Sequence, residues 1–241
     1  MARWLAGVDG CKGGWVAAVR APRAAGPTIE VFARFADLLD QLPADAIVAV
    51  DMPIGLPERI GPGGRGPEAL LRPLLGERQS SVFSVPSRSA VSAPDYAAAC
   101  AAALATSDPP RKVSKQCFFL FSKMLEIDAL LRADPALRTR VFESHPEGAF
   151  MRLNGGPLTE PKKVKSQAYG PGLEQRRALL ESAGLARSLL AARPPRGAGA
   201  DDVLDACACL VTAIRLERGE ASSLPAQPAF DAHGIPVAIW M

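Results

Sequence analysis

The sequence predicts an α/β protein with a mixed sheet of five to six strands and helices on both faces. Three observations support this class: an apolar hairpin pattern at residues 4–19, an unbroken apolar run at 46–50, and alternating helix-like and strand-like stretches after it. With 241 residues, 48% of them hydrophobic, the chain can bury a core without disulfides. We expect a single domain over residues 1–241, with an inserted loop and helical region at about 55–133.

The first predicted elements are strands. Residues 4–8 and 15–19 are mostly apolar, and the turn residues at 11–14 join them into a hairpin. Residues 28–33 give a third strand, and residues 37–42 a short helix. The apolar run at 46–50 fits a strand that is buried on both faces.

The insert begins with a stretch that we expect to be irregular. Residues 61–67 alternate glycine and proline around one arginine, which predicts a partly mobile loop between 55 and 88. Further elements follow in order: helices at 95–105 and 114–133, a strand at 140–143, a helical turn at 146–153, a loop at 155–171, helices at 173–191 and 201–217, and a strand at 236–241.

Carboxylates stand at the ends of the predicted strands. Asp9 ends the first strand before a glycine-rich turn, and Asp51 ends the buried strand before a proline. If these strands are parallel neighbours, both acids lie at the same edge of the sheet. Glu143 also ends a strand, and Asp202 and Asp205 share a face of the last helix.

Several carboxylates without histidine or cysteine suit a hard divalent cation. We therefore expect Mg²⁺ or Mn²⁺ at Asp9, Asp51, Asp202 and Asp205, where it could activate water for phosphodiester cleavage. Each acid also has a plainer interpretation as a turn residue or cap. Asp202 could be only the cap of the last helix, or Asp201 could be the cap and leave Asp202 free. Glu143 could pair with a surface lysine or arginine.

Five sequence blocks resemble the signature of a known family. They are GVDGCKGGW at 7–15, VDMPIGLP at 50–57, SVFSVPSR at 81–88, ESHPE at 143–147 and DDVLDA at 201–206. Together they resemble domain-of-unknown-function family 429, whose members are described as predicted RNase H-like nucleases. The resemblance implies an RNase H-like fold, with Asp9 as the acid of the first strand and Asp51 as the acid after the fourth. The Asp202-x-x-Asp205 pattern is similar to the acidic end of Holliday-junction resolvases, where both acids complete the metal site.

Five further residues in or beside these blocks are candidate substrate contacts. Lys12, Arg88, Lys115 and Lys163 could hold phosphate oxygens, although a solvated surface charge is the commoner role of a lysine. His145 could orient a water or carry a proton, or it could be a structural hydrogen-bonding group at a strand end.

Three function classes are consistent with these residues. The leading expectation is a metal-dependent phosphodiester hydrolase acting on nucleic acid, with Asp9, Asp51, Glu143, Asp202 and Asp205 as catalytic residues. Its weak point is the net charge of only +3. The alternative is a phosphotransferase or ATPase of the actin and sugar-kinase type, with phosphate held at residues 10–14. A non-catalytic regulatory module is the third class.

Cysteine usage and hydropathy point to a cytoplasmic location. The five cysteines include no CxxC pair, and the chain has neither a secretory signal pattern nor an apolar run long enough to span a membrane. We expect the apolar final strand, residues 237–240, to be exposed and able to pair with a second copy, which would give a homodimer.

Overall fold

The computed structural model describes residues 3–165 and 167–241. Within them the chain forms two compact units. Unit 1 contains the chain up to residue 51, residues 140–222 and residues 240–241, and unit 2 contains residues 52–139 and 223–239. The predicted insert at about 55–133 falls within unit 2.

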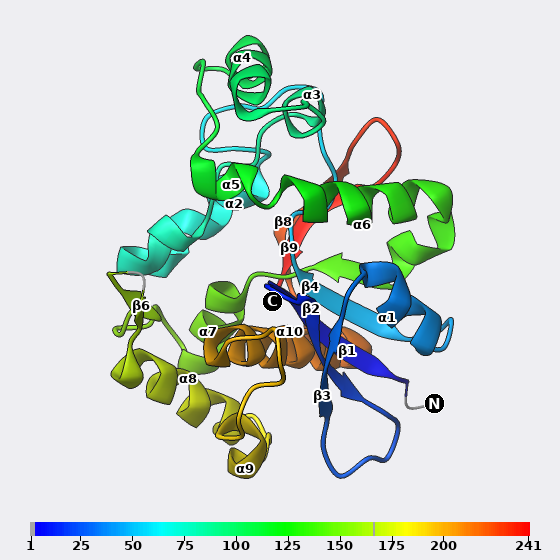
Figure 1. The fold of residues 1–241 in the computed structure, drawn as a ribbon, viewed down its shortest axis with the longest axis vertical. Helices are drawn as coiled ribbons and strands as arrows, with labels where there is room; N and C mark the ends of the chain where they lie inside the picture. The colour runs from blue at the N-terminus through cyan, green and yellow to red at the C-terminus, as the bar shows by residue number, and fades with distance from the viewer. Residues whose placement is uncertain (1–2, 166) are drawn as a thin grey trace. The chain divides into compact units, whose positions relative to one another are not determined.

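Unit 1 is built on a five-stranded sheet with the order β3-β2-β1-β4-β5 (Figure 1). The strands are β1 (Leu5–Cys11), β2 (Gly14–Arg20), β3 (Thr28–Phe32), β4 (Ile47–Asp51) and β5 (Val141–Glu143). β2 runs antiparallel to β1 and β3, whereas β4 runs parallel to β1 and β5. This mixed sheet confirms the predicted α/β class and is consistent with the RNase H-like fold that the resemblance implies.

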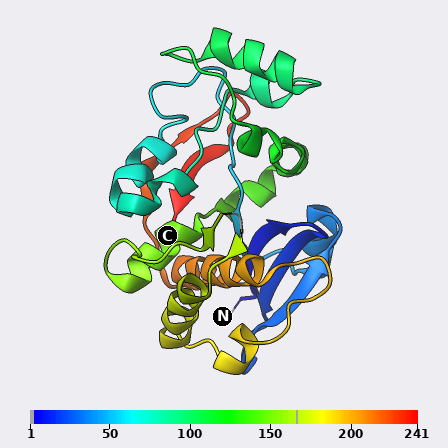
Figure 2. The same ribbon diagram turned by 60° about the vertical axis from the view of Figure 1, so that its left-hand side comes forward.

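Helices cover both faces of this sheet. Val16 of β2 belongs to the same core cluster as the buried side of α10 (Ala200–Arg218). Trp15, its neighbour, meets Phe35 of α1 (Phe35–Gln41) edge-on, with 5.1 Å between ring centroids. Because successive strand residues point to opposite faces, α1 and α10 lie on opposite sides of the sheet. Figure 2 shows α10 lying along the sheet.

α10 packs directly on the backbone of β1. A Cβ atom at Gly7 would lie 1.9 Å from the backbone nitrogen of Leu210 and 2.2 Å from the carbonyl oxygen of Ala206. Only glycine permits such a close approach of strand and helix. The contact brings the first turns of α10 next to the carboxyl ends of β1 and β4.

The remaining elements of unit 1 are three helices and one short hairpin, joined by loops. They are α7 (Pro146–Asn154), the strand pair β6 (Lys163–Val164) and β7 (Gln167–Ala168), α8 (Gly170–Ser182) and α9 (Arg187–Leu190). The prediction of one helix over 173–191 is wrong, because Gly184 adopts a left-handed φ of +94° and ends the first helix before α9 begins. The β6–β7 pair lies in the segment predicted as a loop.

Unit 2 contains more regular structure than the sequence predicts. Its elements are α2 (Pro67–Leu71), the 3₁₀-helix η1 (Arg72–Ser81), α3 (Arg88–Val91), α4 (Tyr96–Thr106), α5 (Lys115–Phe118), α6 (Phe121–Ala133), η2 (Pro135–Thr139), β8 (Ser223–Phe230) and β9 (Pro236–Trp240, with its last residue in unit 1). The expected loop between 55 and 88 is confirmed up to residue 66 and is wrong beyond it, because Pro67 opens α2, which η1 follows. The predicted helix at 114–133 is divided into α5 and α6.

The final strand has a partner within the chain. β9 pairs with β8 in a two-stranded sheet, and Val237, Ala238 and Ile239 are buried. The expectation that residues 237–240 are exposed is therefore wrong. The homodimer stays a prediction without this support.

Candidate metal centre

Three aspartates of unit 1 meet at the end of the sheet. Asp9 and Asp51 are direct neighbours in the parallel register of β1 and β4, and Asp205 lies in the second turn of α10. Each offers one carboxylate oxygen, and these three atoms lie within 4.8 Å of one another. The structure thus brings together three of the four acids that were predicted to bind a metal.

The three carboxylates disfavour one another's charge. Burial raises the pKa of Asp9 well above its ordinary value, and the charges of Asp51 and Asp205 raise it further. Burial and the charge of Asp205 raise the pKa of Asp51 to about 8. Burial also raises the pKa of Asp205. Ionised carboxylates this close together need a positive charge beside them.

Lys162 supplies one positive charge. Its ammonium group forms an ion pair with Asp205 and lies 3.7 Å from Oδ2 of Asp201. Burial by itself lowers the pKa of Lys162, but the charges of Asp205 and Asp9 outweigh burial and raise it. Lys162 is not among the predicted site residues, whereas its neighbour Lys163 is; Lys163 is exposed and pairs with Asp201 at 2.7 Å. The two lysines are adjacent in the sequence, and no local pattern distinguishes the one that reaches the aspartates.

The segment that carries Lys162 is fixed at both ends. The backbone nitrogen of Tyr169 donates to the carbonyl oxygen of Lys162 at 3.0 Å, which closes the β6–β7 hairpin. A Cβ atom at Gly172 would lie 1.8 Å from the carbonyl oxygen of Pro161, so the start of α8 packs tightly on the residue before Lys162. This close packing holds the base of the segment that brings Lys162 to the acids.

The other two predicted acids have different positions. The N-cap residue of α10 is Gly199, and the carboxylate of Asp202, three residues later, accepts a hydrogen bond from its backbone nitrogen at 2.8 Å. The alternative with Asp201 as the cap is wrong, because Asp201 lies inside the first turn of the helix, where it pairs with Lys163. Glu143 is buried and lies beside Val50 in register, so it leaves the sheet on the opposite face from Asp51. The charges of both residues still act on the aspartate group: that of Asp202 raises the pKa of Asp9, and that of Glu143 raises the pKa of Asp51.

A second buried ion pair lies beside the three aspartates. Glu147 of α7 pairs with Arg176 of α8, whose side chain is fully buried. Arg176 also donates through Nη1 to the carbonyl oxygen of Gly172 at 2.8 Å. The charge of Glu147 raises the pKa of Asp205, and that of Arg176 lowers it. Glu147 lies in one of the sequence blocks, whereas no motif pointed to Arg176.

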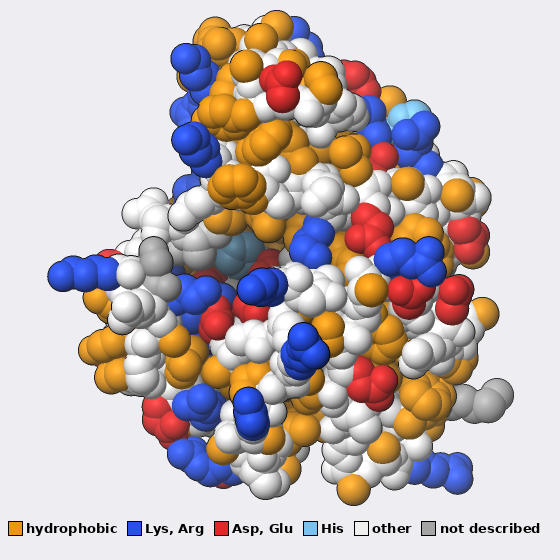
Figure 3. All heavy atoms as spheres, viewed as in Figure 1, with side chains coloured by type: hydrophobic (Ala, Val, Ile, Leu, Met, Phe, Trp, Pro, Cys, Tyr) orange, Lys and Arg blue, Asp and Glu red, His pale blue; other side chains and the backbone are white. Residues whose placement is uncertain are grey.

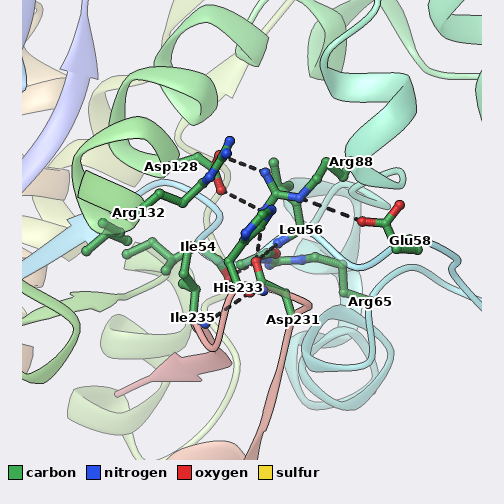
Figure 4. Close-up of polar contacts among 12 residues, drawn as sticks. Ile54, Leu56, Glu58, Arg65, Arg88, Asp128, Arg132, Asp231, His233 and Ile235 are labelled. Carbon is green, nitrogen blue, oxygen red and sulfur yellow. Dashed lines mark hydrogen bonds and ion pairs between the residues drawn. The ribbon is translucent and has the colours of Figure 1, made fainter. Parts of the chain in front are cut away.

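The predicted substrate contacts are spread over both units. In unit 1, Lys12 is exposed in the β1–β2 turn, and His145 is half-buried just before α7. In unit 2, Lys115 is exposed at the start of α5, and Arg88 binds two carboxylates of its own unit (Figure 4). Contact of these residues with phosphate stays a prediction.

Comparison with known proteins identifies the family. A protein-family profile described as "Protein of unknown function (DUF429)" matches residues 7–229. The chain belongs to this family. The match confirms the resemblance and includes all three aspartates of this DUF429 protein. Comparisons with curated proteins and with solved structures gave no match. Across the part of the chain that the structure describes, no helix is long and apolar enough to span a membrane.

Proposed function

We propose that this DUF429 protein is a metal-dependent phosphodiester hydrolase acting on nucleic acid. The observation that carries the proposal is the group formed by Asp9, Asp51 and Asp205, whose oxygens lie within 4.8 Å of one another. The group stands at the carboxyl ends of two parallel strands, where α/β proteins commonly place their chemistry.

The donor set fits a divalent cation of the Mg²⁺ or Mn²⁺ type. The three side chains offer only carboxylate oxygens, which are the ligands that these ions prefer. Burial raises the pKa of all three carboxyls, and the charges of neighbouring acids raise the pKa of Asp9 and Asp51 further, so a bound cation would favour their ionised forms. A bound cation of this kind lowers the pKa of a water and stabilises charge on a phosphoryl oxygen.

The chain's own residues would position the substrate. Asp9 and Asp51 are held by the parallel pairing of β1 and β4, and Asp205 is held by the packing of α10 on Gly7. Lys162 already contacts this group, so we assign it the role of holding a phosphate oxygen beside the carboxylates. The buried Glu147–Arg176 pair lies near Asp205, and its two charges have opposite effects on the pKa of that carboxyl. Lys12 and His145 stay candidates for further contacts in unit 1.

Calorimetry with Mg²⁺ and Mn²⁺ tests the metal site. We expect binding by the wild type and loss of binding in Asp9→Asn and Asp205→Asn. Asp45→Asn is the matched control, because Asp45 is an exposed acid of unit 1 outside the group. A wild type that binds neither ion contradicts the metal site.

A nuclease assay under the same ions tests the activity. Single-stranded, double-stranded and branched DNA, and RNA, should be compared with and without a chelator. We expect cleavage that needs the ion and is lost in Asp9→Asn but kept in Asp45→Asn. Metal binding without cleavage of any of these substrates contradicts the hydrolase. Thermal stabilisation by ATP with Mg²⁺, in the absence of any effect of oligonucleotides, would favour the phosphotransferase alternative.

A further inference from the structure

Unit 2 contains a basic pocket of about 540 Å³. Its lining residues are Ala129, Arg132, Ala133, Arg138 and His233. α6 supplies the first three, η2 supplies Arg138, and the turn between β8 and β9 supplies His233. No lining residue is acidic. In the space-filling view, Lys and Arg side chains gather beside this turn (Figure 3).

The turn that carries His233 is fixed by one carboxylate. Oδ1 of Asp231 accepts hydrogen bonds from the backbone nitrogens of His233 at 2.9 Å and Ile235 at 3.0 Å. Oδ2 accepts another from the backbone nitrogen of Leu56 at 3.1 Å. Figure 4 shows these residues around Asp231. The backbone position of His233 is therefore set before any ligand binds.

The two arginines are held in complementary ways. Nε of Arg138 donates to the carbonyl oxygen of Leu131 at 2.8 Å, which fixes the plane of the guanidinium. A Cβ atom at Gly234 would lie 3.5 Å from Nη1 of Arg138, so this group lies against the turn. Arg132 shares a face of α6 with Ala129, three residues earlier, and the small side chain there leaves room for a ligand.

Arg88 binds the two carboxylates that interact with the pocket residues Arg132 and His233, namely those of Asp128 and Asp231. It binds Asp128 with both terminal nitrogens, at 2.7 and 2.8 Å, and Asp231 at 2.9 Å. Arg132 reaches Asp128 only at 3.7 Å, and its side chain is 49% exposed. The terminal nitrogens of Arg138 and the half-exposed guanidinium of Arg132 therefore stay available to a ligand.

We infer that this pocket binds a phosphate-type oxyanion. Two guanidinium groups and an imidazole converge on it, and guanidinium groups match the oxygen geometry of phosphate. The ligand could be a phosphomonoester or a phosphodiester of a nucleic-acid backbone, which present the same phosphoryl oxygens. None of the lining residues belongs to the aspartate group, so the inference does not depend on the proposed hydrolase.

The chain's histidine content makes the test specific. The protein has only two histidines, so the imidazole proton signals in an NMR spectrum can be assigned with His233→Gln. Inorganic phosphate is titrated into the full-length protein in the presence of a chelator, which removes any metal-dependent chemistry. We expect a saturable shift of the His233 signals.

Variants separate this pocket from general surface charge. Arg132→Gln and Arg138→Gln should each weaken phosphate binding about tenfold, the effect of losing one charged hydrogen-bonding group. Arg111→Gln is the matched control, because Arg111 is an exposed arginine of unit 2 outside the pocket, and it should leave binding unchanged. A far-ultraviolet circular dichroism spectrum confirms that each variant is folded.

The outcome of the titration decides the inference. The absence of a saturable His233 shift, or an equal shift in the Arg132→Gln/Arg138→Gln double variant, overturns it. If phosphate binds, a nucleoside 5′-monophosphate and an unphosphorylated oligonucleotide distinguish a phosphomonoester ligand from a nucleic-acid backbone. Tighter binding of the monophosphate identifies a terminal phosphate as the ligand, whereas tighter, salt-sensitive binding of the oligonucleotide identifies a nucleic-acid backbone. Loss of nuclease activity in Asp9→Asn leaves this result unaffected.

Discussion

Asp9 and Asp51 are register partners across the parallel strands β1 and β4, and Asp205 of α10 meets both. Residues in register on neighbouring strands point to the same face, so the sheet itself places the first two carboxylates side by side. The third arrives because α10 lies against Gly7, two residues before Asp9. Two packing relationships therefore define the whole acid group, and each can be tested separately.

Replacing Asp51 with asparagine should stabilise the metal-free protein at pH 8. Burial and the charge of Asp205 raise the pKa of Asp51 from 3.8 to about 8, so the folded state binds a proton that the unfolded state releases. This carboxyl therefore lowers stability progressively as pH rises from about 4 to about 8. In denaturant unfolding across this range, the free energy of unfolding of Asp51→Asn should increase relative to that of the wild type as pH rises. Added Mn²⁺ should stabilise the wild type and the control variant Asp45→Asn, but not Asp51→Asn.

Removing the charge of Lys162 should destabilise the metal-free protein. Lys162→Gln leaves Asp205 without its ion-pair partner, and we expect a loss of roughly 1–3 kcal/mol, discounted for the partial exposure of the lysine. Mn²⁺ should restore much of this loss because it brings charge to the same carboxylates. Lys163→Gln removes an exposed lysine from Asp201, which Lys162 also approaches at 3.7 Å, and should cost at most about 1 kcal/mol. Equal losses in the two variants would contradict the role of Lys162.

A methyl group at Gly7 should disrupt the packing of α10. The Cβ atom of Gly7→Ala would lie 1.9 Å from a backbone nitrogen of the helix, so strand and helix must separate. We expect destabilisation of roughly 3 kcal/mol or more and weaker Mn²⁺ binding, since Asp205 moves with the helix. Gly156→Ala, where nothing lies within 4 Å of the new atom, should stay within about 0.5 kcal/mol of the wild type. Normal metal affinity in Gly7→Ala would contradict the inference that the packing of α10 on Gly7 positions Asp205.

The carboxylate of Asp231 should stabilise unit 2 at neutral pH and lose this effect in acid. Burial by itself raises its pKa, but hydrogen bonds from three backbone nitrogens and the charge of Arg88 outweigh burial and lower it. Its stabilisation is therefore complete above about pH 4 and disappears as pH falls through the lowered pKa. Asp231→Asn should cost about 1–3 kcal/mol at pH 7 and progressively less below pH 4. Glu77→Gln, at an exposed pair, should show no such trend.

The sheet and its acidic edge were accessible from sequence because local patterns encode them. The apolar run before Asp51 and the glycine-rich turn after Asp9 predicted both strands and their ends. The local pattern left their parallel pairing as a condition, and the place of Asp205 beside them was implied by the resemblance to the resolvases. The separation of Asp202 from the group was not accessible, because its bond to the backbone of Gly199 depends on the path of the chain into α10.

Other features had no local signal. β8 contains prolines at 225 and 228 and lacks alternation, so its sequence is not typical of a strand, and its pairing with β9 is a tertiary effect. Lys162 and Arg176 reach the acid group through the fold of the 155–176 segment. The role of Arg88 also depended on tertiary partners, because Asp128 and Asp231 are far from it in sequence.

The contact between Gly7 and α10 also sets an order of events during synthesis. The strands that carry Asp9 and Asp51 leave the ribosome early, whereas Asp205 is made long after them. Domains begin to fold from the N-terminal end while the chain grows, so β1 can pair with β2 before any of α10 exists. The three-carboxylate centre therefore cannot form on a nascent chain that stops short of α10, and a partly made protein cannot carry out the chemistry that the complete centre supports.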